Sequence, residues 1–325
     1  MNGLSKDAVN WVEVDVESDG QRIDNFLARL LKGVPKSHVY RILRSGEVRV
    51  NGHRAEASTR LAAGDRLRIP PIRVAARTAS QGVPAPVAAR PLPVLLEDEH
   101  LLAVDKPAGL AVHGGSGVSH GVIERLRAER PDARFLELVH RLDRDTSGVL
   151  LLAKKRTALT DLHAQMREGR TDKRYLTLVR GRWVGGGRTL DAPLAKYVLE
   201  GGDRRVEVNA GGQEARTMVR PVRLLDGFSL LEARLLTGRT HQIRVHLAHA
   251  GLPICGDDKY GDFSLNKELA KKGLKRMFLH AARLQFVHPA TRVRVSIESP
   301  LPRELAGFVE RLAEGGEAAS GGGAE

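Results

Sequence analysis

The stretch from Ile72 to Pro93 restricts the fold of this chain of 325 residues more than any other feature. It is rich in Pro, Ala and Arg, and it lacks both the helical and the alternating periodicity of apolar residues that a packed element needs. Such a composition is typical of a semi-rigid extended linker. The sequence therefore predicts two globular domains over residues 21–70 and 94–312, which a linker over 71–93 joins. Residues 313–325 consist only of Gly, Ala, Ser and Glu, so we expect a disordered tail there.

The charge of the chain is positive and unevenly spread. There are 52 Lys and Arg against 39 Asp and Glu, which gives a formal net charge of +13. Residues 21–70 alone contain 11 basic and 4 acidic residues, so this short segment contributes +7 of the excess. Such a charge favours a polyanionic partner, either nucleic acid or an acidic membrane surface. A helix predicted near Ser37 would bring Lys36, Arg41 and Arg44 together, and we expect these three to bind nucleic acid rather than form an ordinary solvated face.

Cysteine content and hydropathy limit the class of protein. The single Cys255 excludes an intrachain disulfide framework and any zinc or iron–sulfur site built from cysteines. No apolar run approaches the roughly 18 residues that a membrane span needs. Residues 1–16 contain acids and lack the apolar core of a secretory signal. We therefore expect a cytoplasmic protein in a reducing compartment, without a membrane partner.

The larger segment combines short apolar runs with a few helical patterns. Its predicted strands are His100–Val104, Val149–Ala153, Tyr175–Val179, Ser229–Leu236 and Arg292–Ile297, and its predicted helices are Thr157–Glu168 and Thr240–Ala250. The regular strand–helix alternation of a doubly wound sheet is missing. An α+β domain with a mixed, largely antiparallel sheet and flanking helices is therefore expected. In residues 21–70, two predicted helices and a few short strands indicate a small separate module.

The segment Val139–Gly148 is the richest in ionisable side chains, and it directly precedes the apolar run Val149–Ala153. Charged groups next to a buried strand are unfavourable unless they are paired or face a cleft. We expect Asp145 to cap the following turn through backbone N–H groups, but we do not expect this structural role for Asp143. Because the turn separates the two side chains, an acid/base pair of the glycosidase kind is not expected.

Two further segments contain candidate site residues. In Thr237–Leu247, Thr240 is the predicted N-cap of a helix with Arg239 at its mouth, and an arginine near a buried carboxylate stabilises the ionised form. In Asp172–Arg180, Tyr175 opens a predicted strand directly after two basic residues. It is a candidate for stacking on a nucleic-acid base, although a lone tyrosine in a strand is more often part of the core.

Two other patterns do not support a site. The spacing of His241, His246 and His249 does not match a helical metal-binding pair, so we expect no metal, and the last two are interpreted as packed or surface side chains. The glycine-rich stretch His113–Gly117 lacks the Lys-Ser/Thr ending of a phosphate loop and the second glycine of a nucleophile elbow. A plain flexible loop is expected there.

Taken together, these segments resemble the RluA family of RNA pseudouridine synthases. The resemblance rests on Lys106-Pro107-Ala108-Gly109, His140-Arg141-Leu142-Asp143 with Thr146-Ser147-Gly148, Lys173-Arg174-Tyr175, and the segment from Gly238 to Arg244. Arg22-Ile23-Asp24 and the segment from Val48 to Gly52 resemble an S4 RNA-binding domain. The segments Lys32 to Ser37 and Ala111 to Gly117 are most similar to the family members that modify 23S ribosomal RNA.

The resemblance implies an isomerase that converts uridine to pseudouridine in 23S ribosomal RNA without a cofactor. Asp143 would act on an extruded nucleotide, either as nucleophile or as base, and Arg244 would hold it in its ionised form. Tyr175 would stack on the uracil, and Arg141 would fill the space that the extruded base leaves.

Two other functions remain open from the sequence. One is an RNA-binding or ribosome-assembly protein with an idle second domain, against which Asp143, Tyr175 and Arg244 argue. The other is a nucleic-acid glycosidase, which would use a carboxylate on the same bond but release the base. A monomer is expected, because no apolar surface stripe stands out in the sequence.

Overall fold

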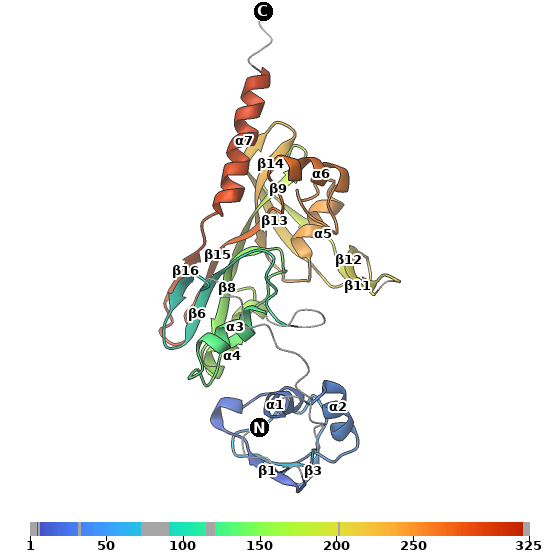
Figure 1. The fold of residues 1–325 in the computed structure, drawn as a ribbon, viewed down its shortest axis with the longest axis vertical. Coiled ribbons are helices and arrows are strands. Elements are labelled where there is room, and N and C mark those ends of the chain that lie inside the picture. Colours follow the sequence, from blue (N-terminus) through green and yellow to red (C-terminus); the bar gives the residue numbers. More distant parts are fainter. Residues whose placement is uncertain are drawn as a thin grey trace, which may run out of the picture. The chain divides into compact units, whose positions relative to one another are not determined.

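The computed structural model describes residues 5, 7–31, 34–72, 91–114, 121–200 and 202–320, except for the side chains of Lys36 and residues 315–320. The chain divides into two compact units, Met1–Arg90 and Pro91–Glu325 (Figure 1). Most of the predicted linker, residues 73–90, lies outside the described residues. So do residues 115–117 of the glycine-rich stretch and residues 321–325 of the predicted tail.

The first unit contains short strands and two helices in its described part. In chain order the elements are β1 (Asn10–Glu13), the 3-10 turn η1 (Val16–Ser18), α1 (Ile23–Leu30), α2 (Lys36–Arg44), β2 (Arg49–Val50), β3 (His53–Arg54) and β4 (Arg66–Ile69). The strands form one antiparallel sheet in the order β1-β4-β2-β3. The predicted pair of helices followed by short strands is confirmed.

The core of the first unit follows from helical periodicity. Its buried residues include Ile23, Phe26 and Leu27 of α1, Val39, Ile42 and Leu43 of α2, and Leu67 and Ile69 of β4. Apolar residues three and four positions apart place one face of each helix against the sheet. The remaining surface of α2 leaves Arg41 and Arg44 exposed.

The second unit is built around one large sheet. In chain order its described elements are β5 (Val94–Glu97), β6 (Leu101–Lys106), α3 (Val122–Glu129), β7 (Glu137–Leu138), β8 (Ser147–Ala153), α4 (Arg156–Arg167), β9 (Asp172–Arg180), β10 (Arg188–Asp191), β11 (Leu194–Val198), β12 (Arg204–Val208), β13 (Arg216–Leu225), β14 (Phe228–Leu235), α5 (Gln242–His249), α6 (Phe263–Lys271), β15 (Leu279–Val287), β16 (Arg294–Glu298) and α7 (Arg303–Ser320).

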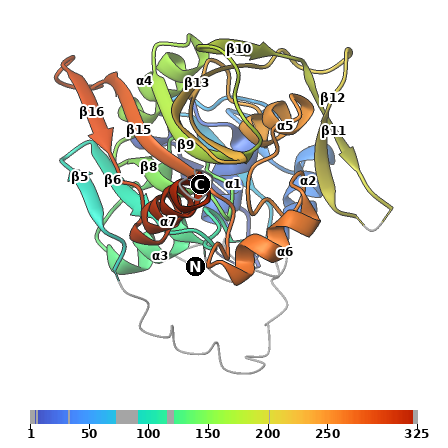
Figure 2. The ribbon, with the colours of Figure 1, turned by 90° about the horizontal axis from the view of Figure 1, so that it is seen from above.

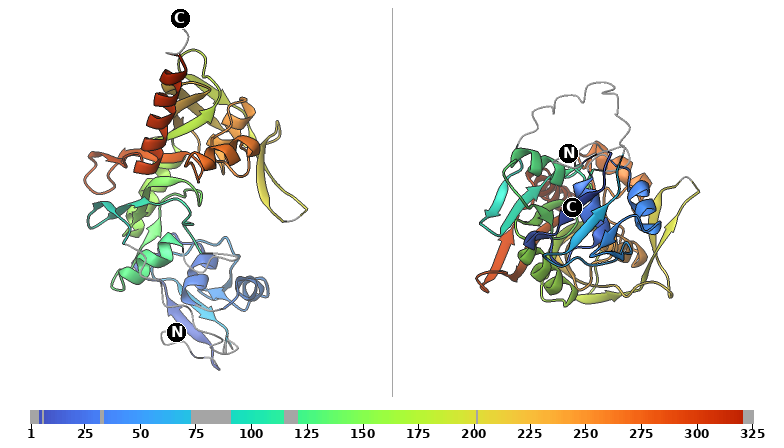
Figure 3. Two further views of the ribbon diagram at one scale, coloured as in Figure 1. Left: turned by 45° about the horizontal axis from the view of Figure 1, so that its top comes forward. Right: turned by 90° about the horizontal axis from the view of Figure 1, so that it is seen from below.

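The sheet has the strand order β10-β13-β14-β9-β15-β8-β6-β5, with β16 paired to β15 and β7 to β8. Only the pairing of β15 with β8 is parallel among the described strands. The expected mixed, largely antiparallel sheet of an α+β domain is therefore confirmed. Strands β11 and β12 form a separate two-stranded ribbon that projects from this unit (Figures 2 and 3).

Helices cover both faces of the sheet. Because side chains alternate along a strand, Leu150 of β8 and Tyr175 of β9 belong to the core that α3 and α5 cover. Leu151 points to the opposite face and packs with residues of α4. Leu178 of β9 belongs to a further buried cluster, in which it packs with residues of α6 and α7. No described helix combines the length and the apolar character needed to cross a bilayer.

Gly148 sets the start of β8. Its φ of 109° is unusual for a residue with a side chain, and a Cβ at this position would lie 2.2 Å from the Ala281 carbonyl oxygen. The backbone of β8 can approach β15 this closely only where there is no side chain. The first residues of β8 are therefore held directly against β15, which lies more than a hundred residues later in the sequence.

Helix α7 extends as far as Ser320 and thus into residues 313–325, for which the sequence predicts a disordered tail. Leu305 and Phe308 anchor the helix by packing into the core beside α6. The Ala and Glu residues that follow have high helix propensity and, despite Gly315 and Gly316, extend a helix that packing has already nucleated. Composition alone does not reveal that anchor.

Candidate active site

Asp143 lies in the loop between β7 and β8. The Thr146 amide donates to the Asp143 carbonyl at 3.2 Å and closes a turn. The buried ammonium of Lys106 donates to the Arg144 carbonyl at 2.9 Å, and so ties the loop to the end of β6. The Asp143 side chain keeps an exposed fraction of 28% and lines two cavities. The loop therefore presents this carboxylate to space that a ligand can enter.

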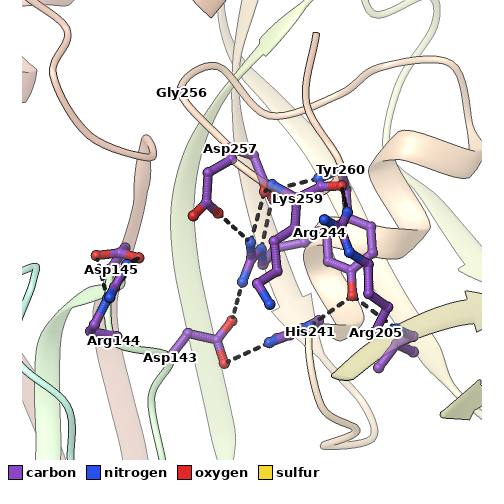
Figure 4. Close-up of polar contacts among 12 residues, drawn as sticks. Asp143, Arg144, Asp145, Arg205, His241, Arg244, Gly256, Asp257, Lys259 and Tyr260 are labelled. Carbon is purple, nitrogen blue, oxygen red and sulfur yellow. Dashed lines mark hydrogen bonds and ion pairs between the residues drawn. The ribbon is translucent and has the colours of Figure 1, made fainter. Parts of the chain in front are cut away.

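Asp145 does not have the role that the sequence predicts. No described backbone amide donates to its carboxylate, which instead pairs with the Arg144 guanidinium at 3.2 Å. The turn is closed by the Asp143 carbonyl, so it needs no side-chain cap. The two carboxylates have different partners (Figure 4).

The start of α5 also differs from the prediction. The helix begins at Gln242, and its N-cap is His241 in a left-handed conformation with φ of 53°, not Thr240. The Gln242 side-chain oxygen accepts from the Arg239 amide at 2.9 Å, and in this way a side chain from inside the helix holds the preceding loop. Arg239 donates its Nε to the Glu214 carbonyl rather than to a carboxylate of the site.

Arg244, on the first turns of α5, contacts three acidic residues, of which Figure 4 shows Asp143 and Asp257. Its Nη1 donates to Asp143 Oδ2 at 3.1 Å. Its Nε and Nη2 donate to the two oxygens of Asp257 at 2.7 Å each, and Nη2 also reaches Asp258 at 3.3 Å. The side chains of Arg244 and Asp257 are only 6% and 1% exposed, so this bidentate pair is buried.

Burial and charge act in opposite directions on this pair. Burial lowers the pKa of Arg244, but the hydrogen bonds and charge of Asp257, with those of Asp143, outweigh it and leave that pKa raised. Burial raises the pKa of Asp257, but Arg244 and the amides of Lys259 and Tyr260 outweigh it and leave that pKa lowered. Arg244 therefore presents a permanent positive charge to Asp143.

Asp257 and Tyr260 are residues of this site that sequence reasoning misses. The Tyr260 ring lies 5.1 Å from the Arg244 guanidinium carbon, and the Tyr260 amide donates to Asp257 at 3.1 Å. The available signal was the run of polar residues between Gly256 and Gly261, which follows an apolar stretch just as Asp143 precedes one.

His241 connects Tyr260 to Asp143. The Tyr260 hydroxyl accepts from the Val206 amide at 2.9 Å and lies 2.8 Å from His241 Nδ1. The other ring nitrogen of His241, Nε2, lies 3.9 Å from Asp143 Oδ1. Burial lowers the pKa of His241, which favours the neutral ring.

Tyr175 and Arg141 also line the larger cavity, which has a volume of about 910 Å³. Tyr175 is 7% exposed and is at once a core residue and part of the cavity wall. Burial, with a smaller contribution from Asp143, raises its pKa, so the hydroxyl stays protonated. Arg141 is exposed and also lines a second cavity of about 370 Å³. With Arg244, the four predicted site residues of this unit surround one space of ligand size.

The histidines at the end of α5 lie as predicted. His246 is buried, with its ring nitrogens 2.9 Å from the Thr217 hydroxyl and 3.0 Å from the Ala192 carbonyl, and His249 is exposed. Within the described ranges, no group of three or more His, Cys, Asp or Glu side chains is arranged to hold a metal ion.

The three predicted RNA-binding residues belong to α2 of the first unit. Lys36 starts the helix, and its side chain lies outside the description. Arg41 and Arg44 are exposed, and Arg41 is 3.6 Å from Glu47 and 3.3 Å from His38. Exposed cations with weak surface partners are available to bind an anion.

Comparison with known proteins identifies both units. The family described as RNA pseudouridylate synthase matches residues 100–249, and the S4 domain matches residues 21–67. Among curated proteins, ribosomal large subunit pseudouridine synthase C of Salmonella typhi and that of Escherichia coli (strain K12) are each 52% identical over 309 residues, which cover 94% of this chain and 97% of each relative. The protein of the same name from Pasteurella multocida is 48% identical over 94% of this chain and 95% of its own.

Solved structures agree with this assignment. Human RNA pseudouridylate synthase domain containing 4 has a TM-score of 0.56 and 26% identity, over 68% of this chain and 92% of its own. Human RNA pseudouridylate synthase domain containing 1 has a TM-score of 0.54 and 25% identity, over 68% and 94%. From its motifs, its fold and its identity to these proteins over nearly all its length, the chain belongs to the RNA pseudouridine synthase family of isomerases and has an S4 domain in its first unit.

Proposed function

We propose that this chain converts uridines of 23S ribosomal RNA to pseudouridine, with Asp143 as the catalytic carboxylate. The support for the substrate is the name of the relatives, ribosomal large subunit pseudouridine synthase C, at 52% identity over 94% of the chain. The observation that carries the choice of residue is the pairing of Asp143 with the buried Arg244 at the wall of the larger cavity.

The target uridine first leaves its stack, because the bond between its base and ribose is otherwise shielded. Arg141 is exposed at the cavity wall and is long enough to occupy the vacated position in the RNA. The uracil then stacks against the ring of Tyr175 in the cavity.

Asp143 acts on the extruded nucleotide as nucleophile or as base. The C1′–N1 bond breaks, the uracil turns against Tyr175, and a new bond joins C5 to C1′ while the proton on C5 is lost. Arg244 contributes a fixed charge that keeps Asp143 ionised, because Asp257 holds the guanidinium in place from the other side. The reaction is a rearrangement, so it needs no hydride, phosphate or oxidant.

The test uses 23S ribosomal RNA transcribed with tritium at C5 of uridine. The wild-type protein is expected to release tritium to solvent, and Asp143→Ala to reduce the single-turnover rate by at least ~10³-fold while still binding RNA. Asp145→Asn is the matched control, because this carboxylate pairs with the exposed Arg144 and lies only two positions away. It is expected to keep the wild-type rate within about 3-fold.

The same assay separates the other candidate functions. Release of free uracil instead of tritium would identify a glycosidase. Binding of 23S ribosomal RNA by wild-type protein without any tritium release would leave an RNA-binding protein only. Residual turnover of Asp143→Ala above a few per cent of wild type would reject Asp143 as the catalytic group.

We also propose roles for the two domains expected from the sequence. Residues 21–70 would hold ribosomal RNA through Lys36, Arg41 and Arg44, and residues 94–312 would carry out the reaction. The exposed positions of Arg41 and Arg44 on α2 support the first role. We further propose that the protein acts as a monomer in the cytoplasm, with ribosomal RNA as its partner.

A further inference from the structure

We propose that the ammonium group of Lys173 stabilises the negative charge that develops on the uracil when its bond to the ribose breaks. This inference rests on the proposed function and assigns to the same site a second catalytic residue. Three observations carry it: the position of Lys173 beside Tyr175, the absence of a counter-ion among the described residues, and the direction in which electrons move in the reaction.

Lys173 and Tyr175 lie two residues apart on β9, so they point to the same face of the sheet, about 7 Å apart along the strand. Both line the larger cavity together with Asp143. Pairing with β14 and β15 fixes the backbone of Lys173 on both sides. A Cβ at Gly238, another residue of the cavity wall, would lie 3.5 Å from Lys173 Nζ. The ammonium therefore lies within the wall, next to the ring on which the uracil is proposed to stack.

Lys173 differs from the other cations of this region in its surroundings. It is half-buried, and within the described residues no carboxylate, carbonyl or hydroxyl bonds its Nζ, so burial alone lowers its pKa. Its neighbour Arg174, which points to the opposite face, is paired with Asp172 at 2.9 Å and Glu232 at 3.1 Å. The buried Lys106 donates to three backbone carbonyls.

The half-buried His140 ring near Lys173 does not supply a counter-charge. Burial first, and then the charge of Lys173, lower the pKa of His140 to about 3, so the ring is neutral. A half-buried cation with three unused hydrogens is unfavourable by itself. The arrangement is favourable once an anionic or strongly polarised oxygen enters the cavity.

The reaction produces such an oxygen. When the C1′–N1 bond breaks, its electron pair stays with the uracil, and the charge spreads from N1 onto O2 and O4. Donors placed where charge develops lower the barrier far more than they strengthen substrate binding. Tyr175 offers a ring face without a positive charge, and four of the five N–H groups of Arg244 are bonded to Asp143, Asp257 and Asp258. Lys173 donates a hydrogen bond, keeps its protons, and releases the oxygen when C5 bonds to C1′ and loses its proton.

A contact between Lys173 and an RNA phosphate is the alternative. A phosphate contact is present before and during the reaction, so its loss weakens binding and flattens the salt dependence without a selective effect on the chemical step. Loss of a contact to the departing uracil should slow the chemical step and leave RNA affinity unchanged, since the charge on the uracil exists only while the bond is breaking.

The experiment compares Lys173→Met, which keeps most of the length of the side chain but removes the ammonium group, with Lys173→Arg, which keeps the charge. Lys267→Met on α6 is the control, because this lysine lies outside both cavities. Single-turnover tritium release and RNA affinity are measured for each full-length protein. Lys173→Met is expected to slow release by about 10²-fold or more with affinity within about 3-fold. Lys173→Arg is expected to recover part of the rate.

A second measurement uses RNA with 5-fluorouridine at the target position, and follows cleavage of the C1′–N1 bond by nuclease digestion and chromatography. Fluorine stabilises the uracil anion, so the loss caused by Lys173→Met should be smaller on this substrate than on uridine. An equal loss on both substrates, or a loss confined to RNA affinity, would overturn the proposal. If the wild-type protein releases no tritium, the proposed function itself fails; if wild type is active and Lys173→Met is equally active, only the inference about Lys173 fails.

Discussion

The Arg244 guanidinium directs two of its three nitrogen atoms to Asp257 and one to Asp143. Asp257 therefore holds the Arg244 guanidinium in position before the substrate binds. We expect Asp257→Ala to lower the free energy of unfolding of the second unit by about 3–5 kcal/mol, because it leaves the buried Arg244 charge with too little compensation. Tritium release should fall as well, since Asp143 loses a fixed partner.

Asp258 supplies the matched control for this prediction. It is next in the chain and also contacts Arg244, at 3.3 Å, but its side chain is 62% exposed. Asp258→Ala is expected to change the free energy of unfolding by less than about 1 kcal/mol in the same urea titrations. Equal destabilisation by the two substitutions would contradict the central role of Asp257.

His140 makes the stability of the second unit depend on pH. Burial, and then the charge of Lys173, lower its pKa from the ordinary 6.5 to about 3, and its Nε2 accepts from the Leu151 amide at 3.1 Å. Between these two values the unfolded chain binds a proton that the folded chain does not bind. Stability is therefore lost as pH falls below about 6.5, by up to ~1.4 kcal/mol per pH unit from this residue.

Replacing His140 with Asn should make the plot of stability against pH shallower between about pH 4 and 6. The measurement is urea unfolding in a Trp11→Phe background, where Trp183 is the remaining tryptophan. His249→Asn is the control, because His249 is less buried and belongs to the same unit. A slope that stays the same in His140→Asn would show that another group causes the acid sensitivity.

At the scale of elements, periodicity of apolar residues predicts several buried elements, but it misses the central strand β15 and the helix α3, although both have buried residues. The strands β6, β8, β9 and β14 and the helix α4 lie where the sequence predicts them, because each buries at least one continuous face. Strands β10 to β13 are not predicted. They are partly exposed, and β13 also contains Pro221, so their apolar residues do not form a clear pattern.

The candidate site shows the same limit. Motifs in the sequence identify Asp143, Tyr175 and Arg244, and in the structure all three line the larger cavity. Asp257 is not found, because its contact with Arg244 depends on the path of the loop that follows Ile254, a residue bridged to β9. That path needs Gly256, where a Cβ would lie 2.2 Å from the Arg276 carbonyl oxygen. Contacts made by backbone packing leave no periodic signal.

The close parallel pairing of β8 and β15 leads to a prediction about one glycine. We expect Gly148→Ala to lower the free energy of unfolding by more than about 3 kcal/mol, since the new methyl group would meet the Ala281 carbonyl and force the strands apart. Gly227→Ala is the comparison, because Gly227 has a φ of 69° and a Cβ added there would meet no atom within 4 Å. There only the backbone strain of about 1–2 kcal/mol applies. A similar loss of unfolding free energy for the two variants, in thermal or urea unfolding, would argue against a close approach of β8 and β15 at Gly148.

For the whole molecule, we expect the basic residues of the first unit to contribute more to the salt dependence of RNA affinity than those of the second unit. Changing Lys36, Arg41 and Arg44 together to Gln is expected to reduce the slope of log affinity for 23S ribosomal RNA against log salt by about 2–3, since each phosphate contact contributes roughly 0.7–0.9. The rate of single turnover at saturating protein should stay near wild type.

The comparison for this prediction is a second set of three basic residues. Lys267, Lys271 and Lys272 lie on or directly after α6 in the second unit, and changing them to Gln removes the same charge from the chain. Their loss is expected to change the slope by less than about 1. If the α2 variant and the α6 variant have equal slopes, the first unit does not bind RNA through α2.

The contact between Gly148 and Ala281 has a consequence for protein synthesis. Asp143 and its turn are translated early, but Arg244 follows 101 residues later, and Ala281 of β15 later still. A ribosome making this protein therefore exports the basic first unit well before the candidate site can be completed. We expect the site to form only after β15 has been synthesised.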